Sequence, residues 1–87
     1  MKNTKKLSPE DIEKAIVSED YYKLGVKTTV CLLTLRNGFE IIGTSSCVDP
    51  DNYDHDIGRG LAKQKAMDEV WYLEGYRLQQ SIYEVNK

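Results

Sequence analysis

The spacing of apolar and polar residues predicts a helix near the N-terminal end of the chain. A capping hydroxyl, a proline and an acid form a typical start signal: Ser8, Pro9 and Asp11. The apolar positions that follow have helical spacing: Ile12, Ala15, Ile16 and Leu24. Gly25 is a natural stop, so we expect helical structure as far as Leu24, as one helix or as two short helices that meet near Ser18.

Two runs rich in β-branched and apolar residues, 28–35 and 39–46, predict a pair of strands. Asn37-Gly38 lies between them and is the strongest short signal for a two-residue hairpin turn. Counting back from such a turn pairs Arg36 with Phe39 and Leu32 with Gly43. Both faces of this hairpin carry apolar side chains. We therefore expect its own helices to cover one face and another subunit to cover the other.

A second helical region is predicted after the hairpin. Asp49 is a suitable cap, Pro50 suits the first turn, and Val48 is placed to pack on Tyr53 as a hydrophobic staple. From Ile57 the apolar positions keep the helical period for about six turns: Leu61, Ala62, Ala66, Val70 and Leu73. Gly75 is expected to end this long helix, and a narrow apolar stripe then predicts a short terminal helix: Leu78, Ile82 and Val85.

These elements predict an α+β fold with an N-terminal helix, a β-hairpin, a long C-terminal helix and a short terminal helix, in a single domain over residues 1–87. A chain this short buries only about 60% of its unfolded surface, so we expect a homo-oligomer. No apolar run is long enough to span a membrane, and the basic start lacks the apolar region of a signal peptide. We expect a cytoplasmic protein without a membrane partner.

The composition and the reactive side chains argue against several functions. A net charge of −2 does not favour binding to duplex nucleic acid. The single histidine, His55, lies in an acidic helix start, and no nucleophile has an evident base. Cys31 and Cys47 fall on opposite faces in the predicted register, and a reducing cytosol also disfavours a disulfide. The acids around His55 suit a helix start and do not have the spacing of an EF-hand. We expect no enzyme activity, no cofactor and no metal.

Candidate ligand contacts come from arginines, aromatic rings and glycines. Gly58 and Gly60 are costly inside a helix, so they indicate close packing or the approach of a ligand or a partner backbone. Guanidinium groups suit phosphate, and flat rings can stack on bases, although surface ion pairs and interface packing explain the same residues individually. The predicted ligand-binding residues are Arg36, Asn37, Tyr53, Arg59, Lys63, Trp71 and Arg77.

Longer stretches of the sequence carry a resemblance. The segments 31–40, 43–47, 49–54, 57–59 and 71–76 together resemble a family of small proteins of tailed phages and prophages that has no assigned activity. The resemblance runs from about Leu7 to Leu78. Tyr53 stands where that family often has phenylalanine, and the loop before Thr28 is short. Family membership implies a phage accessory protein, and we infer a counter-defence role from the small size and the absence of catalytic chemistry.

In size and layout the chain is also similar to phage sponge proteins, which oligomerise and sequester cyclic nucleotide or cyclic ADP-ribose signals of bacterial immune enzymes. Our leading hypothesis is a homo-oligomer with pockets between subunits that bind a small phosphate-containing nucleotide. The arginines would pair with phosphates, Asn37 would read polar edges, and Tyr53 or Trp71 would stack on the base. One alternative is an inhibitor that binds a host defence enzyme or CRISPR effector directly. Another is a metal-dependent hydrolase or nuclease that uses the acidic cluster.

Overall fold

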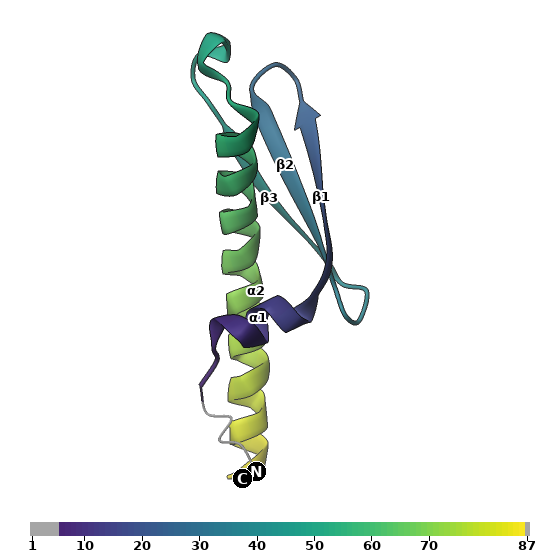
Figure 1. The fold of residues 1–87 in the computed structure, drawn as a ribbon. Helices are drawn as coiled ribbons and strands as arrows, with labels where there is room; N and C mark the ends of the chain where they lie inside the picture. The colour runs from purple at the N-terminus through teal and green to yellow at the C-terminus, as the bar shows by residue number, and fades with distance from the viewer. Residues whose placement is uncertain (1–5, 87) are drawn as a thin grey trace.

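The computed structural model describes residues 6–86, in which a three-stranded antiparallel sheet packs against one long helix (Figure 1). The elements in chain order are α1 (Pro9–Ala15), β1 (Ile16–Leu24), β2 (Thr28–Leu35), β3 (Glu40–Ser46), the 3₁₀ turn η1 (Pro50–Asn52) and α2 (His55–Val85). The strand order is β1-β2-β3. This confirms the α+β class, the N-terminal helix, the strand pair and the long C-terminal helix.

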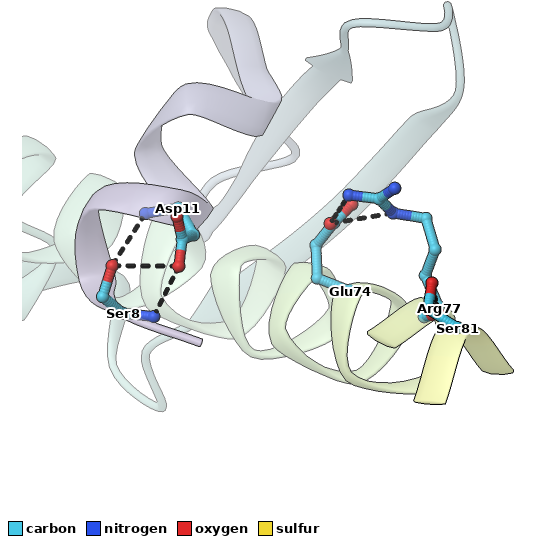
Figure 2. A network of polar contacts seen from close by, with 5 residues as sticks. All are labelled: Ser8, Asp11, Glu74, Arg77 and Ser81. Atoms are coloured by element: carbon cyan, nitrogen blue, oxygen red, sulfur yellow. Dashed lines mark hydrogen bonds and ion pairs between the residues drawn. The ribbon is translucent and has the colours of Figure 1, made fainter. Parts of the chain in front are cut away.

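Helix α1 begins where the sequence predicts. The Ser8 hydroxyl accepts a hydrogen bond from the Asp11 backbone N–H at 3.2 Å, and the Asp11 carboxylate accepts one from the Ser8 N–H at 2.9 Å (Figure 2). This reciprocal capping box satisfies donors that the first helical turn leaves unpaired. Ile12 and Ala15 are buried, so α1 contributes one apolar side to the core.

The predicted continuation of α1 to Leu24 is wrong, because Ile16–Leu24 forms the edge strand β1. Ile16 pairs with Leu35 at one end and Leu24 with Thr28 at the other. Gly25, with φ of +68°, lies in the tight turn to β2. Most side chains of β1 are exposed, so a helix here would have had little apolar face to bury, whereas a strand obtains its backbone hydrogen bonds from β2.

The loop between β2 and β3 has three residues, not the predicted two. The Leu35 N–H donates to the Phe39 carbonyl at 2.8 Å, and Gly38, with φ of +90°, donates to the Leu35 carbonyl at 2.9 Å. The predicted pairing of Arg36 with Phe39 is therefore wrong, and the whole register shifts by one residue. Leu32 pairs with Ile42 instead of Gly43. Because side chains alternate between sheet faces, this shift decides which residues of β3 enter the core.

The core lies between one face of the sheet and α2. Residues that point to this face are mostly buried: Thr29, Cys31, Leu33, Leu35, Ile41 and Ser45. The side of α2 that meets them is made of small residues: Gly58, Ala62, Ala66 and Val70. An added Cβ at Gly43 would collide with the Ala62 carbonyl oxygen and lie 2.5 Å from the Ala66 backbone nitrogen. Glycine at this position therefore lets the helix backbone come directly onto β3.

The opposite face of the sheet has no covering element within residues 6–86. Val30 and Leu32 are half-buried there, while Tyr22 and Ile42 are more than half exposed. The expectation of apolar residues on both faces is thus confirmed, with one face covered by α2. Coverage of the other face by a second subunit stays a prediction.

Helix α2 is continuous for 31 residues, so the predicted break at Gly75 and the separate terminal helix are wrong. Its cap is Asp54, whose carboxylate accepts from the backbone N–H groups of Asp56 and Ile57. Asp49 caps η1 instead, and Val48 is almost fully exposed, so the predicted staple on Tyr53 does not form. A glycine inside a helix costs only about 1 kcal/mol, which the rest of so long a helix can offset. The C-terminal turns of α2 extend beyond the sheet (Figure 1).

Candidate functional site

A hollow of about 360 Å³ lies where the end of α1, the β2–β3 loop and α2 come together. Six residues line it: Ala15, Leu35, Arg36, Asn37, Glu74 and Arg77. Three of the predicted ligand-binding residues, Arg36, Asn37 and Arg77, therefore meet at one place although they are distant in sequence. This is the largest group of predicted residues that the structure brings together.

The β2–β3 loop is held in place from two sides. The Arg36 backbone N–H donates to the Ala15 carbonyl at 3.0 Å, which ties the loop to the end of α1. The Asn37 side-chain oxygen accepts from the Phe39 N–H at 3.0 Å and closes the turn. This uses one of the two lone pairs of the Asn37 amide oxygen and leaves the NH₂ group as a donor for a ligand.

Arg77 is oriented by an ion pair within α2. Its Nη2 and Nε atoms donate to the same Glu74 carboxylate oxygen, at 2.8 and 3.1 Å (Figure 2). The Glu74 side chain is largely buried and that of Arg77 largely exposed, so the guanidinium stands at the edge of the hollow with one face toward solvent. Sequence reasoning did not single out Glu74. The i,i+3 spacing of the two residues is the signal that could have found it.

The hollow carries a positive charge overall, from two guanidinium groups and one carboxylate. The part of the chain that the structure describes supplies no ion-pair partner for Arg36. The hollow contains no cysteine, serine or histidine that could act as nucleophile or base. Its chemistry therefore fits binding of an anion that also offers hydrogen-bond donors to Glu74.

Arg59 and Lys63 lie elsewhere, on the side of α2 that faces β1. The Lys63 ammonium is 2.9 Å from the Glu19 carboxylate, and the Arg59 guanidinium lies 5.3 Å from the centre of the Tyr21 ring. The Tyr21 hydroxyl donates to Glu19 at 2.7 Å. These contacts attach the edge strand to the helix.

The contacts of this cluster shift the pKa values of its members. The hydrogen bond from Lys63 lowers the pKa of Glu19 and raises the pKa of Lys63. Burial, and then the hydrogen bond to Glu19, raise the pKa of Tyr21. The shifts favour the charged carboxylate, the charged ammonium and the neutral phenol, which together hold the cluster.

Tyr53 is at the opposite end of the sheet from the hollow. Its hydroxyl is 2.7 Å from the Thr29 hydroxyl, and the Lys23 ammonium lies 4.6 Å from the centre of its ring. The His55 ring packs against it edge to face at 5.3 Å. Tyr53 thereby connects η1 to the end of β2.

Gly58 and Gly60 have different surroundings, although the sequence pattern offers the same explanations for both. A Cβ at Gly58 would lie 2.5 Å from the Thr29 side-chain oxygen, so close packing on β2 explains this glycine. A Cβ at Gly60 would meet nothing within 4 Å, and the same holds for Gly75. Within the described chain, no contact requires glycine at either of these two positions.

Trp71 lies on the outer side of α2, away from the sheet. It lines a shallow hollow of about 690 Å³ with Asp68, Tyr72, Gly75 and Tyr76. The seven predicted residues thus occupy four separate places: the hollow beside the β2–β3 loop, the β1–α2 contact, the η1 end and the outer side of α2.

The two cysteines are free thiols, with Cys31 buried and Cys47 half-buried. Burial raises the pKa of Cys31. The register argument for their separation is wrong, because the Cys47 N–H donates to the Lys27 carbonyl and places both cysteines on one face. They are separated along the sheet instead: Cys31 pairs with Gly43, which precedes Cys47 by four residues or about 13 Å of strand.

Two of the acidic residues near His55 serve as helix caps. Asp49 and Asp54 use their carboxylates to cap η1 and α2. Among residues 6–86, no three side chains of histidine, cysteine, aspartate or glutamate are grouped so that they could hold a metal ion.

Comparison with known proteins adds one result. A family model described as phage protein (N4 Gp49/phage Sf6 gene 66) matches residues 7–82. The chain belongs to this family. Membership in the N4 Gp49/phage Sf6 gene 66 family confirms the predicted relation to small phage proteins, and the match includes every residue of the hollow. No curated protein and no solved structure matches the chain. None of the helices in residues 6–86 is long and apolar enough to cross a membrane.

Proposed function

We propose that this phage protein is a counter-defence binding protein that sequesters a small phosphate-containing nucleotide, of the cyclic nucleotide or cyclic ADP-ribose type, as an oligomer. The observation that supports the proposal is the hollow in which Arg36, Asn37 and Arg77 converge. Such signals carry phosphate groups for arginine and polar base edges for an amide.

The side chains of the hollow suit the two parts of such a ligand. Among residues 6–86 the Arg36 guanidinium has no ion-pair partner and can make bidentate contacts with a phosphate, and Arg77 still has its Nη1 group after pairing with Glu74. The Glu74 carboxylate and the Asn37 NH₂ group would bind a ribose hydroxyl and a base edge. A carboxylate beside the arginines disfavours bare phosphate and favours a nucleotide, which brings its own donors.

Binding of the nucleotide without any reaction is the simplest activity for this hollow, because no nucleophile lies next to a base among the residues that line it. A signal that is bound tightly and stoichiometrically no longer reaches its receptor, so binding alone would inhibit the defence. Tyr53 and Trp71 lie outside the hollow of their own chain. In an oligomer with pockets between subunits, a neighbouring copy would have to supply such a ring.

Native mass spectrometry with cyclic dinucleotides, cyclic trinucleotides and cyclic ADP-ribose isomers tests the proposal. We expect one class to be retained intact. Arg36→Ala and Arg77→Ala should each weaken retention by roughly 10- to 100-fold, the effect of losing a charged hydrogen bond. Arg59→Ala is the matched control, because it removes the same group outside the hollow. Equal loss in all three variants would contradict the site.

The same experiment distinguishes the alternatives. A ligand that is released in cleaved form would show an enzyme rather than a binding protein. Retention of no ligand would contradict sequestration and would favour direct inhibition of a host enzyme or CRISPR effector, which a pull-down of purified candidate effectors would then test.

A further inference from the structure

A stripe of exposed residues winds slowly around α2, from its outer side toward the side next to β3. Its members are Ile57, Leu61, Lys65, Asp68, Tyr72 and Tyr76, at spacings of 4, 4, 3, 4 and 4 residues. The average spacing is slightly longer than the 3.6 residues of a helical turn, so neighbouring members lie close together while the stripe as a whole turns by about 100° around the helix. The four apolar members are 52–77% exposed. So many large exposed side chains in one stripe mark an interaction surface.

The stripe has the same order of apolar and charged positions from either end, with the signs of the two charges exchanged. Two apolar residues are followed by a charge, an opposite charge and two further apolar residues. If a second, antiparallel copy of α2 is laid on the stripe with a two-fold axis between Lys65 and Asp68, each Lys65 faces the Asp68 of the other copy. Leu61 then faces Tyr72, and Ile57 faces Tyr76. A parallel copy would place like charges opposite each other, so only the antiparallel arrangement is complementary.

Two glycines provide independent support. Gly60 and Gly75 each weaken the helix by up to about 1 kcal/mol relative to alanine, and outside the adjoining turns of α2 neither has a neighbour among residues 6–86 within 4 Å of its missing Cβ. Across the same two-fold axis, Gly60 lies within two residues of the height of Gly75 in the other copy. Both stand on the side of the stripe that carries Trp71. Glycine at these points lets a second helix approach closely, as Gly43 does for the sheet inside the chain.

From these observations we infer that two copies of this chain associate antiparallel through the outer face of α2. Leu61 and Ile57 of one copy fill the shallow hollow that Tyr72, Tyr76 and Trp71 form on the other. The paired charges at the centre set the register. The interface stands independently of the nucleotide in the proposed function, and it specifies which surface would join the subunits of the oligomer.

Sedimentation velocity on the full chain, over a range of concentrations, tests this interface. We expect the wild type to form a dimer. Lys65→Asp creates two contacts per dimer in which acids face each other, and Asp68→Lys creates two in which bases face each other. Each variant should therefore weaken self-association by on the order of 10-fold or more. An equimolar mixture of the two variants restores opposite charges at both contacts and should form a heterodimer.

Ile42→Ser is the matched control, because Ile42 is an equally exposed apolar residue on the open face of the sheet. It should leave self-association unchanged, and circular dichroism should show native helix content in every variant. A wild type that is monomeric at all concentrations overturns the inference. A dimer that Ile42→Ser disrupts and Lys65→Asp does not also overturns it, in favour of the sheet face. Nucleotide retention by a variant that no longer dimerises would show that capture of the nucleotide in the proposed function does not depend on this interface.

Discussion

The two sides of α2 are built in opposite ways. The side on the sheet consists of small residues, Gly58, Ala62, Ala66 and Val70, and all of them are buried. The outer side carries large apolar residues, and these are exposed: Ile57, Leu61, Tyr72 and Tyr76. In a helix that only covered its own sheet, the large side chains would be expected inside.

The difference shows that the size of a buried side chain depends on the distance between the two packed backbones, as well as on hydrophobicity. Gly43 lets the backbone of α2 lie directly on β3, so little space remains between the helix and the strand. A side chain as small as alanine fills that space. The large outer side chains are more than half exposed and lie outside the buried core of the chain. A second copy on this side of α2 would bury them.

The largest expected effect comes from closing the space between helix and sheet. Gly43→Val should destabilise the fold by about 3 kcal/mol or more, because its Cβ would meet the backbone of α2, which cannot move aside as a flexible side chain can. Urea unfolding measures this. Thr44→Val, one residue along on the open face, is the control and should change the unfolding free energy by less than about 0.5 kcal/mol. Equal effects would mean that the close approach is not needed.

A direct comparison of the two sides should give the next largest effect. Val70→Ala removes two buried methyl groups and should cost about 2 kcal/mol of unfolding free energy. Tyr72→Ala removes far more apolar surface, yet at concentrations where the chain is monomeric it should change stability by less than about 0.5 kcal/mol. A larger loss in the monomer would show that Tyr72 packs within its own chain.

Replacing Gly60, for which no contact within residues 6–86 requires glycine, tests the outer side of α2 separately. Gly60→Ala should raise the stability of the monomer by up to about 1 kcal/mol, because the new methyl group would meet no other element within residues 6–86 and the helix gains intrinsic propensity. The same change should weaken self-association if a second helix approaches there. Thermal unfolding and sedimentation of one sample measure both. A destabilised monomer would mean that Gly60 serves the fold.

The smallest effect concerns the ion pair between Glu19 and Lys63. The folded-state pKa of Glu19 lies below its ordinary value of 4.5, so its contribution is present above that value and is lost as the pH falls through the lowered pKa. The pKa of Lys63 lies above 10.5, so its contribution is lost as the pH rises through the raised pKa. Both side chains are about one-third exposed or more, which limits the effect to less than about 1 kcal/mol.

Glu19→Gln tests this pair. Unfolding free energies at a series of pH values should show a flatter acid limb for the variant than for the wild type. Glu40→Gln, a carboxylate on the other edge strand that forms no ion pair within residues 6–86, is the control. Identical acid limbs for wild type and Glu19→Gln would contradict the stabilising role.

Much of the fold could be predicted from local sequence patterns. The capping box at Ser8 and Asp11, the strand runs 28–35 and 39–46 and the long apolar period after Ile57 all lie where the pattern places them. These features depend on residues that are close in sequence. The relation to phage proteins could be read in the same way, from the segments that the family match includes.

Elements whose state depends on a distant partner could not be predicted. Ile16–Leu24 is a strand because β2 offers it backbone hydrogen bonds, and no local signal shows that partner. The register of β2 and β3 depends on whether Gly38 closes a two- or a three-residue loop, a difference that Asn37-Gly38 alone does not settle. Gly75 looked like a stop, yet α2 continues through it.

The candidate site shows the same division. The sequence by itself determined which side chains have chemistry suited to a phosphate, because that depends on residue type. Only the tertiary structure decided that Arg36 and Arg77 share a hollow with Glu74, whereas Arg59 and Lys63 hold the edge strand. The physical reason is that the position of a side chain in space depends on strand register and helix docking, which are properties of the packed chain rather than of any short segment of it.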